Sequence, residues 1–325
     1  MLLDGHDAQA LQQAAQALAR GELVAMPTET VYGLAARADD DAAVAKIFAA
    51  KGRPADHPLI VHVLDADDAA TFAASLPETA KALMQAFWPG PLTVIVPRAP
   101  GVATAAAGGQ ETVGLRSPAH PVARELLQAA HALGVHGVAA PSANRFGRVS
   151  PTQARHVQDE FGAALLVLDG GDCLVGIESA IVDCSREFPV LLRPGVLTTA
   201  ELEAVLGQPL RERDAAAPRA SGTLEAHYAP TATVRLKSAE QIFAALPGEW
   251  PAGLAVYSRS VPAQQTALWR AMPADALAAA QELFTVLREL DAAGVREIWV
   301  ETPPPDSAWA GVRDRLSRAA AAFEP

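Results

Sequence analysis

The sequence is poor in cysteine and in aromatic residues. Only Cys173 and Cys184 are cysteines among the 325 residues, and Phe, Trp and Tyr together make up 5%. Two cysteines are too few for a disulfide framework or a four-cysteine zinc site, so we interpret both as ordinary thiols of a reducing compartment. Because half of the residues are apolar and few are aromatic, the core must be built mainly from Ala, Val and Leu.

Positive charge and long apolar runs are also scarce. The 26 Lys and Arg are outnumbered by 37 Asp and Glu, which gives a formal charge of −11. Broad adhesion to nucleic acid needs a surplus of Lys and Arg, so only a local basic crevice is compatible with this composition. No apolar run approaches the roughly 18 residues of a membrane span, and the N-terminal segment is acidic where a signal peptide is basic. We expect a cytoplasmic protein without membrane contact.

The common catalytic motifs are missing. The glycine-rich segments GGQETVG and GGDCLVG have neither the lysine of a Walker loop nor the spacing of a dinucleotide fingerprint. The sequence contains no His-Glu-x-x-His motif and no nucleophile elbow, and no pair of carboxylates stands out for hydrolytic chemistry. A nucleotide, if one is bound, must be bound in another way.

Short apolar strands alternate with helices through residues 1–206, the first domain that we predict. The expected strands include residues 23–26, 59–63, 92–96 and 112–116, and the expected helices include residues 7–20, a segment that ends at Lys51, and residues 122–132. This alternation predicts an α/β fold with a ligand crevice at the ends of the strands.

A polar, proline-bearing segment at residues 207–231 reads as a linker. It ends in His227-Tyr228-Ala229-Pro230, which places an imidazole and a phenol where a lid can bring them over a neighbouring site, although a simply packed linker is the alternative. Strand and helix patterns resume at residues 232–325. They predict a second, smaller Rossmann-like α/β domain, in which we find no catalytic cluster.

Residues 27–62 connect two of the expected strands and carry several polar side chains. Thr30 follows the first strand, Lys51 and Arg53 stand where a glycine and a proline stop a helix, and His62 lies inside the second strand. Consecutive strands are usually neighbours. If these two are neighbours, the four side chains converge on one crevice.

Further cations and hydroxyls stand at other strand ends. They are Thr112, Arg116, Ser142, Ser150, Ser179 and Arg193, and the amide of Asn144 stands two residues after Ser142. Each has a local alternative, since Ser and Asn are common in turns and Ser150 can cap a helix with Pro151 at its first position. Taken together they suit a polyanionic ligand, because arginine forks match carboxylate and phosphate and hydroxyls fill the remaining acceptors. These residues alone do not identify a reaction.

Five segments in a fixed order carry a resemblance to a known family. They are PTETVYGL at 27–34, KGRPADHPLIVH at 51–62, PSAN at 141–144, ESAIVD at 178–183 and LRPG at 192–195. Together they resemble the YrdC-like threonylcarbamoyl-AMP synthase family, and the linker motif with the second domain resembles its long, two-domain form. The chain departs from the family pattern at His57, where asparagine is expected, and at Ala180, where threonine is usual.

The resemblance implies a twisted sheet around a large concave crevice and a specific reaction. L-threonine, bicarbonate and ATP give L-threonylcarbamoyladenylate and pyrophosphate, with Mg²⁺ accompanying the ATP. The product passes to proteins that form threonylcarbamoyladenosine at tRNA position 37, and a weak contact with tRNA is a further expectation.

The resemblance also implies roles for individual residues. The L-threonine site comprises Thr30, His62, Arg116, Ala140 and Ser179. The ATP site comprises Arg53, His57, Thr112, Ser142, Asn144, Ser150, Arg193 and Tyr228, with Tyr228 closing from the linker. Lys51 and Arg53 are the expected catalytic residues, since they offset the charge that builds on the phosphates during transfer.

Three other functions are alternatives. Hydrogenase-maturation carbamoyltransferases share this type of domain, but they also carry cysteine-rich zinc fingers, which two cysteines exclude. A non-catalytic RNA-binding protein would use the basic crevice, but the overall acidity argues against it. The third alternative is a nucleotide-binding α/β protein with another activity.

Overall fold

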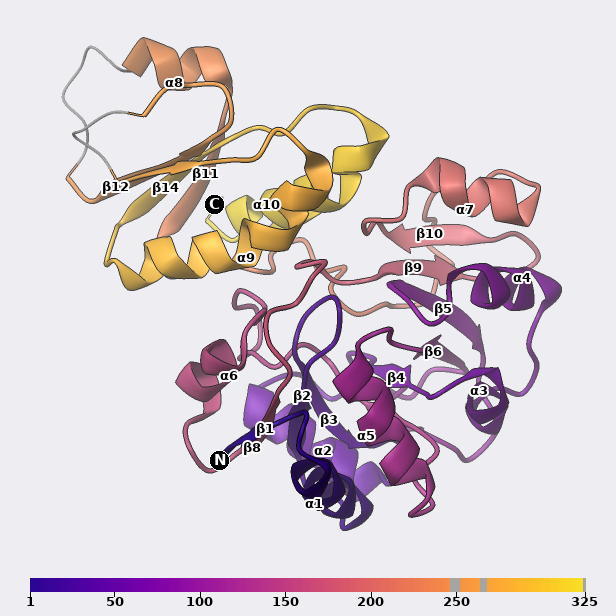
Figure 1. Ribbon diagram of the computed structural model, residues 1–325. Coiled ribbons are helices and arrows are strands. Elements are labelled where there is room, and N and C mark those ends of the chain that lie inside the picture. Colours follow the sequence, from indigo (N-terminus) through magenta and orange to yellow (C-terminus); the bar gives the residue numbers. More distant parts are fainter. Residues whose placement is uncertain (246–251, 264–267, 324–325) are drawn as a thin grey trace.

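The computed structural model describes residues 1–245, 252–263 and 268–323, which form two β-sheets (Figure 1). The larger sheet has ten strands. In spatial order they are β1 (Leu2–Asp4), β8 (Leu166–Asp169), β2 (Val24–Met26), β3 (Gly33–Arg37), β7 (Val138–Ala139), β4 (Ile60–His62), β6 (Thr112–Arg116), β5 (Leu92–Pro97), β9 (Ala180–Asp183) and β10 (Val190–Arg193).

Helices cover the two faces of the larger sheet unequally. On one face α1 (Ala8–Ala19) and α5 (Pro121–His131) pack on strands β2, β3 and β7. The other face is covered by α2 (Asp41–Lys51), α3 (Ala66–Phe72), α4 (Glu78–Phe87), α6 (Ala154–Phe161) and α7 (Thr199–Leu206). Where α1 and α5 end, linker residues Ala217 and Ala220 pack on Ile60, Ile95 and Ile181 instead. One half of that face is therefore closed by the linker rather than by a helix.

The strand order corrects one sequence-based expectation. Strands β2 and β4 are not neighbours, because β3 folds back antiparallel on β2 and β7 pairs with both β3 and β4. The segment Gly33–Arg37 was not expected as a strand, since its short GLAAR sequence has little β-propensity of its own. The buried surroundings, not local preference, make it a strand.

A second correction concerns the start of α6. This helix begins at Ala154 with Gln153 at its N-cap, so Ser150 does not cap it and Pro151 is not its first residue. By contrast, α2 ends as predicted, with Gly52 in the left-handed conformation at φ 64°.

The smaller sheet is entirely parallel. Its spatial order is β11 (Thr233–Lys237), β14 (Glu297–Glu301), β12 (Leu254–Ser258) and β13 (Leu268–Ala271). One face carries α8 (Ala239–Ala245), and the other carries α9 (Ala276–Ala292) and α10 (Ala310–Ala321), which follows a 3₁₀ turn at Ser307–Trp309. This layered arrangement confirms the predicted α/β class of the C-terminal region. Strand β13 was not expected from the sequence. Leu246, the predicted end of α8, lies outside the described residues.

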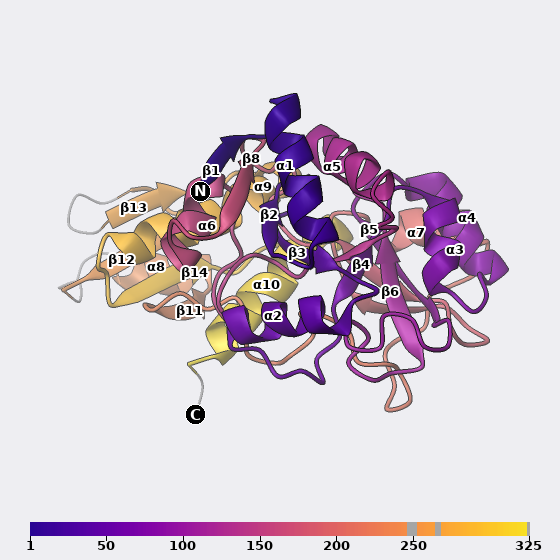
Figure 2. The ribbon, with the colours of Figure 1, turned by 90° about the horizontal axis from the view of Figure 1, so that it is seen from below.

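Helices α9 and α10 lie between the smaller sheet and the larger one (Figures 1 and 2). Two glycines allow this close approach. A Cβ at Gly176 would lie 2.5 Å from the Ala280 carbonyl oxygen of α9, and a Cβ at Gly311 of α10 would lie 2.6 Å from the Gly195 carbonyl oxygen. Neither position tolerates a side chain without separating the two sheets.

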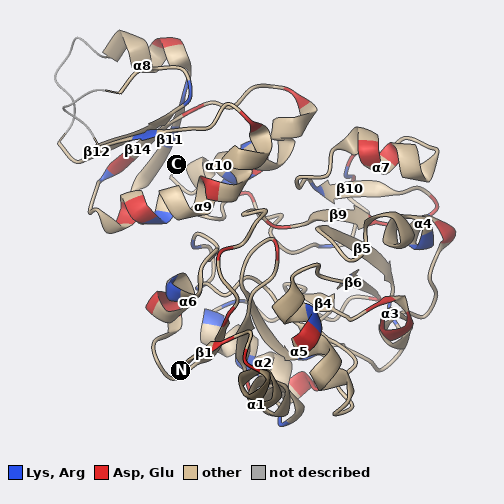
Figure 3. Ribbon diagram, in the orientation of Figure 1, with Lys and Arg blue, Asp and Glu red and all other residues tan. Residues whose placement is uncertain are grey.

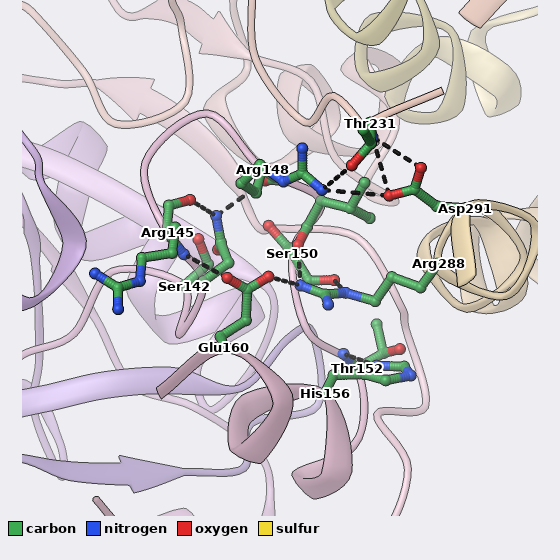
Figure 4. Close-up of polar contacts among 12 residues, drawn as sticks. Ser142, Arg145, Arg148, Ser150, Thr152, His156, Glu160, Thr231, Arg288 and Asp291 are labelled. Carbon is green, nitrogen blue, oxygen red and sulfur yellow. Dashed lines mark hydrogen bonds and ion pairs between the residues drawn. The ribbon is translucent and has the colours of Figure 1, made fainter. Parts of the chain in front are cut away.

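Polar contacts also join the two parts of the chain, as Figure 4 shows. Arg288 of α9 pairs with Glu160 at 2.8 Å and donates to the Val149 and Ser150 carbonyl oxygens. Arg148 pairs with Asp291 of α9 at 3.2 Å. Contacts from the C-terminal domain thus hold the segment that contains Ser150.

The two cysteines are unpaired, as the sequence predicts. Cys173 and Cys184 are buried and unbonded, and burial raises the pKa of the Cys184 thiol to about 12. None of the described helices combines the length and the apolar character that a membrane crossing requires.

Replacing Gly176 by alanine should destabilise the protein by about 1–3 kcal/mol more than replacing Gly171. Both glycines have a positive φ, 80° and 85°, so both substitutions share the backbone strain. Only Gly176 faces another element, because nothing lies within 4 Å of a Cβ at Gly171. Differential scanning calorimetry of the two variants measures the difference, and equal losses would contradict a close-packed interface.

Candidate functional site

The register of two neighbouring strands builds the centre of the site. Strands β4 and β6 are parallel, and His62 lies directly opposite Arg116. Side chains alternate between faces along a strand, so Ile60 and His62 share the face of Thr112 and Arg116, while Val61 and Leu115 enter the core. Both His62 and Arg116 are buried.

Arg116 and His62 have defined partners. The Arg116 guanidinium donates to the Glu29 carboxylate at 2.6 Å, and Glu29 also accepts the backbone N–H of Ala119. Burial, and then the charge of Arg116, lower the pKa of His62 to about 3, so its ring is neutral near pH 7. His62 Nδ1 lies 3.3 Å from the Ile60 carbonyl oxygen, which can only accept. The proton therefore sits on Nδ1, and Nε2 is left as an acceptor.

The segment after β7 forms a second wall. The Ala140 backbone N–H donates to the Ile60 carbonyl oxygen at 3.0 Å, and Ser142 bridges to Gly33. Lys51 Nζ donates to the carbonyl oxygens of Ser142, at 2.6 Å, and of Asn144. Lys51 therefore lies behind this segment and fixes the segment's backbone. Burial, and then the charge of Arg53, lower the pKa of Lys51 well below the ordinary value.

Two arginines close the opposite side. Arg193, at the end of β10, donates to the Ser179 carbonyl oxygen at 3.0 Å and to its hydroxyl at 3.3 Å. Arg53, just after α2, donates to the Pro58 carbonyl oxygen at 2.8 Å. Burial lowers the pKa of both, to about 10 for Arg53, so both are still charged near pH 7.

A buried carboxylate connects the site to the C-terminal domain. Glu178 accepts from the Ser150 hydroxyl through one oxygen and from Arg315 of α10, at 2.9 Å, through the other. Arg315 also donates to the Glu178 and Pro194 carbonyl oxygens. Burial alone raises the pKa of Glu178, but the charges of Arg315 and Arg193 outweigh it and the pKa is lowered.

The linker fills most of the space among these residues. Its segment 219–228 divides the crevice into a central cavity of about 30 Å³ and two flanking cavities of about 20 and 90 Å³. The Tyr228 ring is buried in the central cavity, and Ser221 contacts Arg53 and Arg193. A volume of about 30 Å³ has room for a water molecule or two, so a larger ligand needs more space than the linker leaves here.

Positive charge in the crevice is not balanced by acids. Lys51, Arg53 and Arg193 are buried, and none of them forms an ion pair within the described part of the chain. Two buried polar atoms at the cavity, Arg53 Nε and His227 Nδ1, also lack a hydrogen-bond partner. Burying such groups costs free energy unless a ligand supplies the missing charge or hydrogen bond. Figure 3 shows basic and acidic residues distributed along the ribbon of both domains.

The structure brings most of the predicted site residues together. Those that line the central cavity are Arg53, His62, Arg116, Ala140, Ser142, Arg193 and Tyr228. Ser179, Ser150 and Thr30 stand one contact away, bonded to Arg193, Glu178 and Thr28 respectively. Thr112 and His57 line the two flanking cavities.

Two further predicted residues, Lys51 and Asn144, also lie outside these cavities. Lys51 holds the backbone of the 142–144 segment, as described above. The Asn144 side-chain amide donates to the Arg145 and Arg148 carbonyl oxygens at 2.7 and 2.9 Å, within the segment shown in Figure 4.

Sequence reasoning assigned no role to four residues of the site. Glu29 and Glu178 stand next to predicted residues inside the recognised motifs, and that adjacency is a usable signal. Phe146, which stacks near Arg53 and His57, follows the PSAN motif. Arg315 gave no signal, because a single arginine in an amphipathic helix reads as a surface residue.

Family models match almost all of the chain. Residues 16–195 match the model of the Sua5, YciO and YrdC proteins, described as telomere recombination. Residues 197–321 match the model described as threonylcarbamoyl-AMP synthase, C-terminal domain.

Curated proteins give the same result. The chain is 44% identical to a threonylcarbamoyl-AMP synthase of Pyrococcus abyssi over 228 residues, which span 68% of this chain and 66% of that protein, just under two thirds. It is 34% identical to a threonylcarbamoyl-AMP synthase of Schizosaccharomyces pombe over 96% of this chain and 88% of that protein.

Solved structures of Pyrococcus abyssi Sua5 match both domains. A variant in which a consecutive histidine and tyrosine are replaced by alanine aligns with a TM-score of 0.88 at 34% identity, covering 99% of this chain and 96% of that one. A complex of Sua5 with L-threonine aligns with a TM-score of 0.85 at 34% identity, covering 96% and 94%. In the present chain, His227-Tyr228 is the one place where histidine precedes tyrosine.

The free energy of unfolding should fall as the pH drops from about 6.5 towards 3. Burial lowers the pKa of His62, His156 and His227 to about 3, whereas an unfolded histidine titrates near 6.5. In this window the unfolded chain binds more protons, so stability rises with pH and is lost on acidification, by up to about 1.4 kcal/mol per pH unit for each histidine. Urea unfolding from pH 7 to pH 4 measures the slope.

The variant His156→Gln should take up about one proton fewer on unfolding than the wild type in this pH window, because glutamine does not titrate. The slope of stability against pH should fall accordingly. His6→Gln, at an exposed position, is the matched control and should keep the wild-type slope. An unchanged slope in His156→Gln would contradict the assignment of a buried neutral ring.

The variant Arg315→Met should lose about 3–5 kcal/mol of stability, because it leaves the Glu178 carboxylate buried without its cation. The double variant Arg315→Met, Glu178→Gln should lose less, since the uncompensated charge is then gone. Urea unfolding of the two single variants and the double variant gives the coupling energy. Additive losses would show that the pair is not a unit.

Proposed function

Because the chain belongs to the threonylcarbamoyl-AMP synthase family, we propose that it catalyses the formation of L-threonylcarbamoyladenylate. L-threonine, bicarbonate and ATP are the substrates, and pyrophosphate and water leave. The amino group of threonine takes up CO₂ or a bicarbonate-derived species to form a carbamate. A carbamate oxygen then bonds to the α-phosphorus as the bond to the pyrophosphate oxygen breaks.

The unbalanced positive charge around the crevice is the observation that supports this proposal best. Lys51, Arg53 and Arg193 are buried without acid partners. Their desolvation is compensated when a triphosphate enters and supplies the missing negative charge. This arrangement favours transfer at phosphorus by positioning and electrostatics rather than by a general base.

The threonine site in this proposal lies between β4, β6 and the Ala140 backbone. Arg116 is oriented by Glu29 and faces the threonine carboxylate with its remaining donors. His62 Nε2 accepts a hydrogen bond from the substrate amino or hydroxyl group, because Nδ1 carries the proton. Thr30 and Ser179 complete the pocket through Thr28 and Arg193, which line the cavity. With a pKa near 3, His62 binds substrate and does not remove a proton.

The ATP site in this proposal uses the linker side of the crevice. Arg53 and Arg193 bind the phosphates, and both now donate to Ser221 of the linker. Ser142, Thr112 and His57 line the remaining space, with Lys51 fixing the Ser142 backbone, and the proposal also assigns Asn144 and Ser150, which lie outside the present cavities, to this site. The linker occupies the donors that phosphate needs, so it moves out when ATP binds and closes again with Tyr228 over the nucleotide.

Magnesium enters this scheme with the nucleotide. Among the described residues that line the central cavity, Glu178 is the carboxylate, and both of its oxygens already accept hydrogen bonds. The described lining of this cavity therefore offers no dedicated Mg²⁺ cage, and in the proposal the ion arrives with the ATP phosphates, as is usual for Mg²⁺–ATP. Its chemistry there is to neutralise phosphate charge.

The product in this proposal is handed to proteins that form threonylcarbamoyladenosine at tRNA position 37, with at most a weak contact to tRNA. The net charge of −11 supports a small-molecule enzyme over a nucleic-acid-binding protein.

Release of pyrophosphate from ATP should require both L-threonine and bicarbonate. The assay contains purified protein, ATP and MgCl₂ and omits each substrate in turn, and mass spectrometry identifies the adenylate. Threonine-independent release would contradict the proposed function.

Arg116→Ala should lower kcat/KM for L-threonine about 100-fold, because the threonine carboxylate loses the guanidinium that binds it. Arg270→Ala, at an exposed position in the C-terminal domain, is the control and should keep wild-type activity.

A further inference from the structure

A second cluster of chemically capable side chains lies away from the crevice. It consists of Asp68 on α3, His131 at the last residue of α5, and His136 in the connection from α5 to β7. The potential ligand atoms of the three residues lie within 4.8 Å of one another, and it is the one such group of histidine, cysteine and acidic residues found in the described ranges. The proposed reaction uses none of these residues.

The cluster is built around a buried carboxylate. The Asp68 side chain is 6% exposed, and its Oδ1 lies 3.0 Å from His131 Nδ1 and 3.1 Å from His136 Nδ1. The two imidazole rings meet edge to face with centroids 4.7 Å apart. Both histidine side chains are nearly half exposed, so the group is open to solvent on the side opposite Asp68.

Backbone packing fixes this geometry. Gly137 allows the connection after α5 to lie against α3, because a Cβ at this position would meet the Phe72 ring at 2.6 Å. The Gly137 carbonyl oxygen also accepts the Ala38 backbone N–H. His136 is therefore placed over Asp68 by the fold and not by a flexible side chain alone.

The histidines and Asp68 are hydrogen-bonded in the present structure, and their separations are also close to those between ligands of one metal ion. Two atoms bound to one Zn²⁺ at about 2.0–2.1 Å in a tetrahedral arrangement lie about 3.3 Å apart. The present nitrogen–oxygen distances of 3.0 and 3.1 Å need only a small adjustment. Two imidazoles and one carboxylate form a donor set that suits Zn²⁺ and its neighbours, whereas Mg²⁺ prefers oxygen ligands alone.

We propose that Asp68, His131 and His136 bind a divalent transition-metal ion of the Zn²⁺ kind, with water at the remaining coordination position. The ion ties α3 to the connection between α5 and β7. These two segments flank the paired ends of β4 and β7, where His62 lies opposite Val138, so the metal stabilises the end of that strand pair remote from Ala140. The site acts as a structural clip and is independent of the proposed reaction.

Isothermal titration of the untagged, EDTA-treated protein with ZnCl₂ tests this assignment without an activity assay. We expect saturable one-to-one binding to the wild-type protein and no binding of MgCl₂ in the absence of nucleotide. His131→Asn and His136→Asn should each weaken Zn²⁺ binding more than about tenfold, since even loss of an outer-shell partner costs 10- to 100-fold. Cobalt titration should give visible absorption bands that the same variants lose.

The matched control is His6→Asn, which removes an exposed histidine outside the cluster and should bind Zn²⁺ like the wild type. Both cluster histidines are partly exposed, so their variants should fold, and circular dichroism checks this. Zn²⁺ at 100 times its dissociation constant should raise the melting temperature of the wild type by about 2 °C or more, and not that of the variants. Absence of saturable binding, or equal affinity in all three histidine variants, would overturn the proposal.

Discussion

Buried positive charge without acid partners is the constraint around which the larger domain is arranged. Lys51, Arg53 and Arg193 are each desolvated, and their pKa values are lowered as a result, yet none forms an ion pair among the described residues. A fold tolerates such groups only where backbone carbonyls hold them, as Ser142, Pro58 and Ser179 do here. The same carbonyls keep the cations in place for a ligand that carries the missing charge.

The C-terminal domain takes part in this arrangement through one buried ion pair. Arg315 neutralises Glu178, and Glu178 in turn holds the Ser150 hydroxyl. Arg288 fixes the backbone of the same segment from α9. Because these contacts run from α9 and α10 into the crevice, the second domain is part of the structure that supports the site. It sets the position of residues that a shorter, single-domain chain would have to hold by other means.

The linker couples the domains in a different way. Ser221 and Tyr228 of the linker line the crevice, and Ser221 accepts hydrogen bonds from Arg53 and Arg193 that a substrate replaces in our proposal. The metal cluster that we propose lies beside the end of the β4–β7 pair where His62 is opposite Val138, and none of its three residues lines the central cavity. Strands fixed by core packing on one side, and the linker that we propose to move on the other, suit the opening that the proposed substrates require.

The sequence by itself determined the class of fold and predicted a set of site residues. Motif order singled out Arg53, His62, Arg116, Ser142 and Arg193, which line one cavity in the structure, and periodicity located most strands and helices, because both signals are local. The position of β3 and β7 between β2 and β4, the backbone role of Lys51, and the partnership of Arg315 with Glu178 were decided by the tertiary structure alone. Strand order and buried ion pairs depend on which distant surfaces pack together, and no local pattern encodes that choice. For the same reason the sequence did not reveal the group of Asp68, His131 and His136. Its members lie on three separate segments, which come together where Gly137 packs against Phe72.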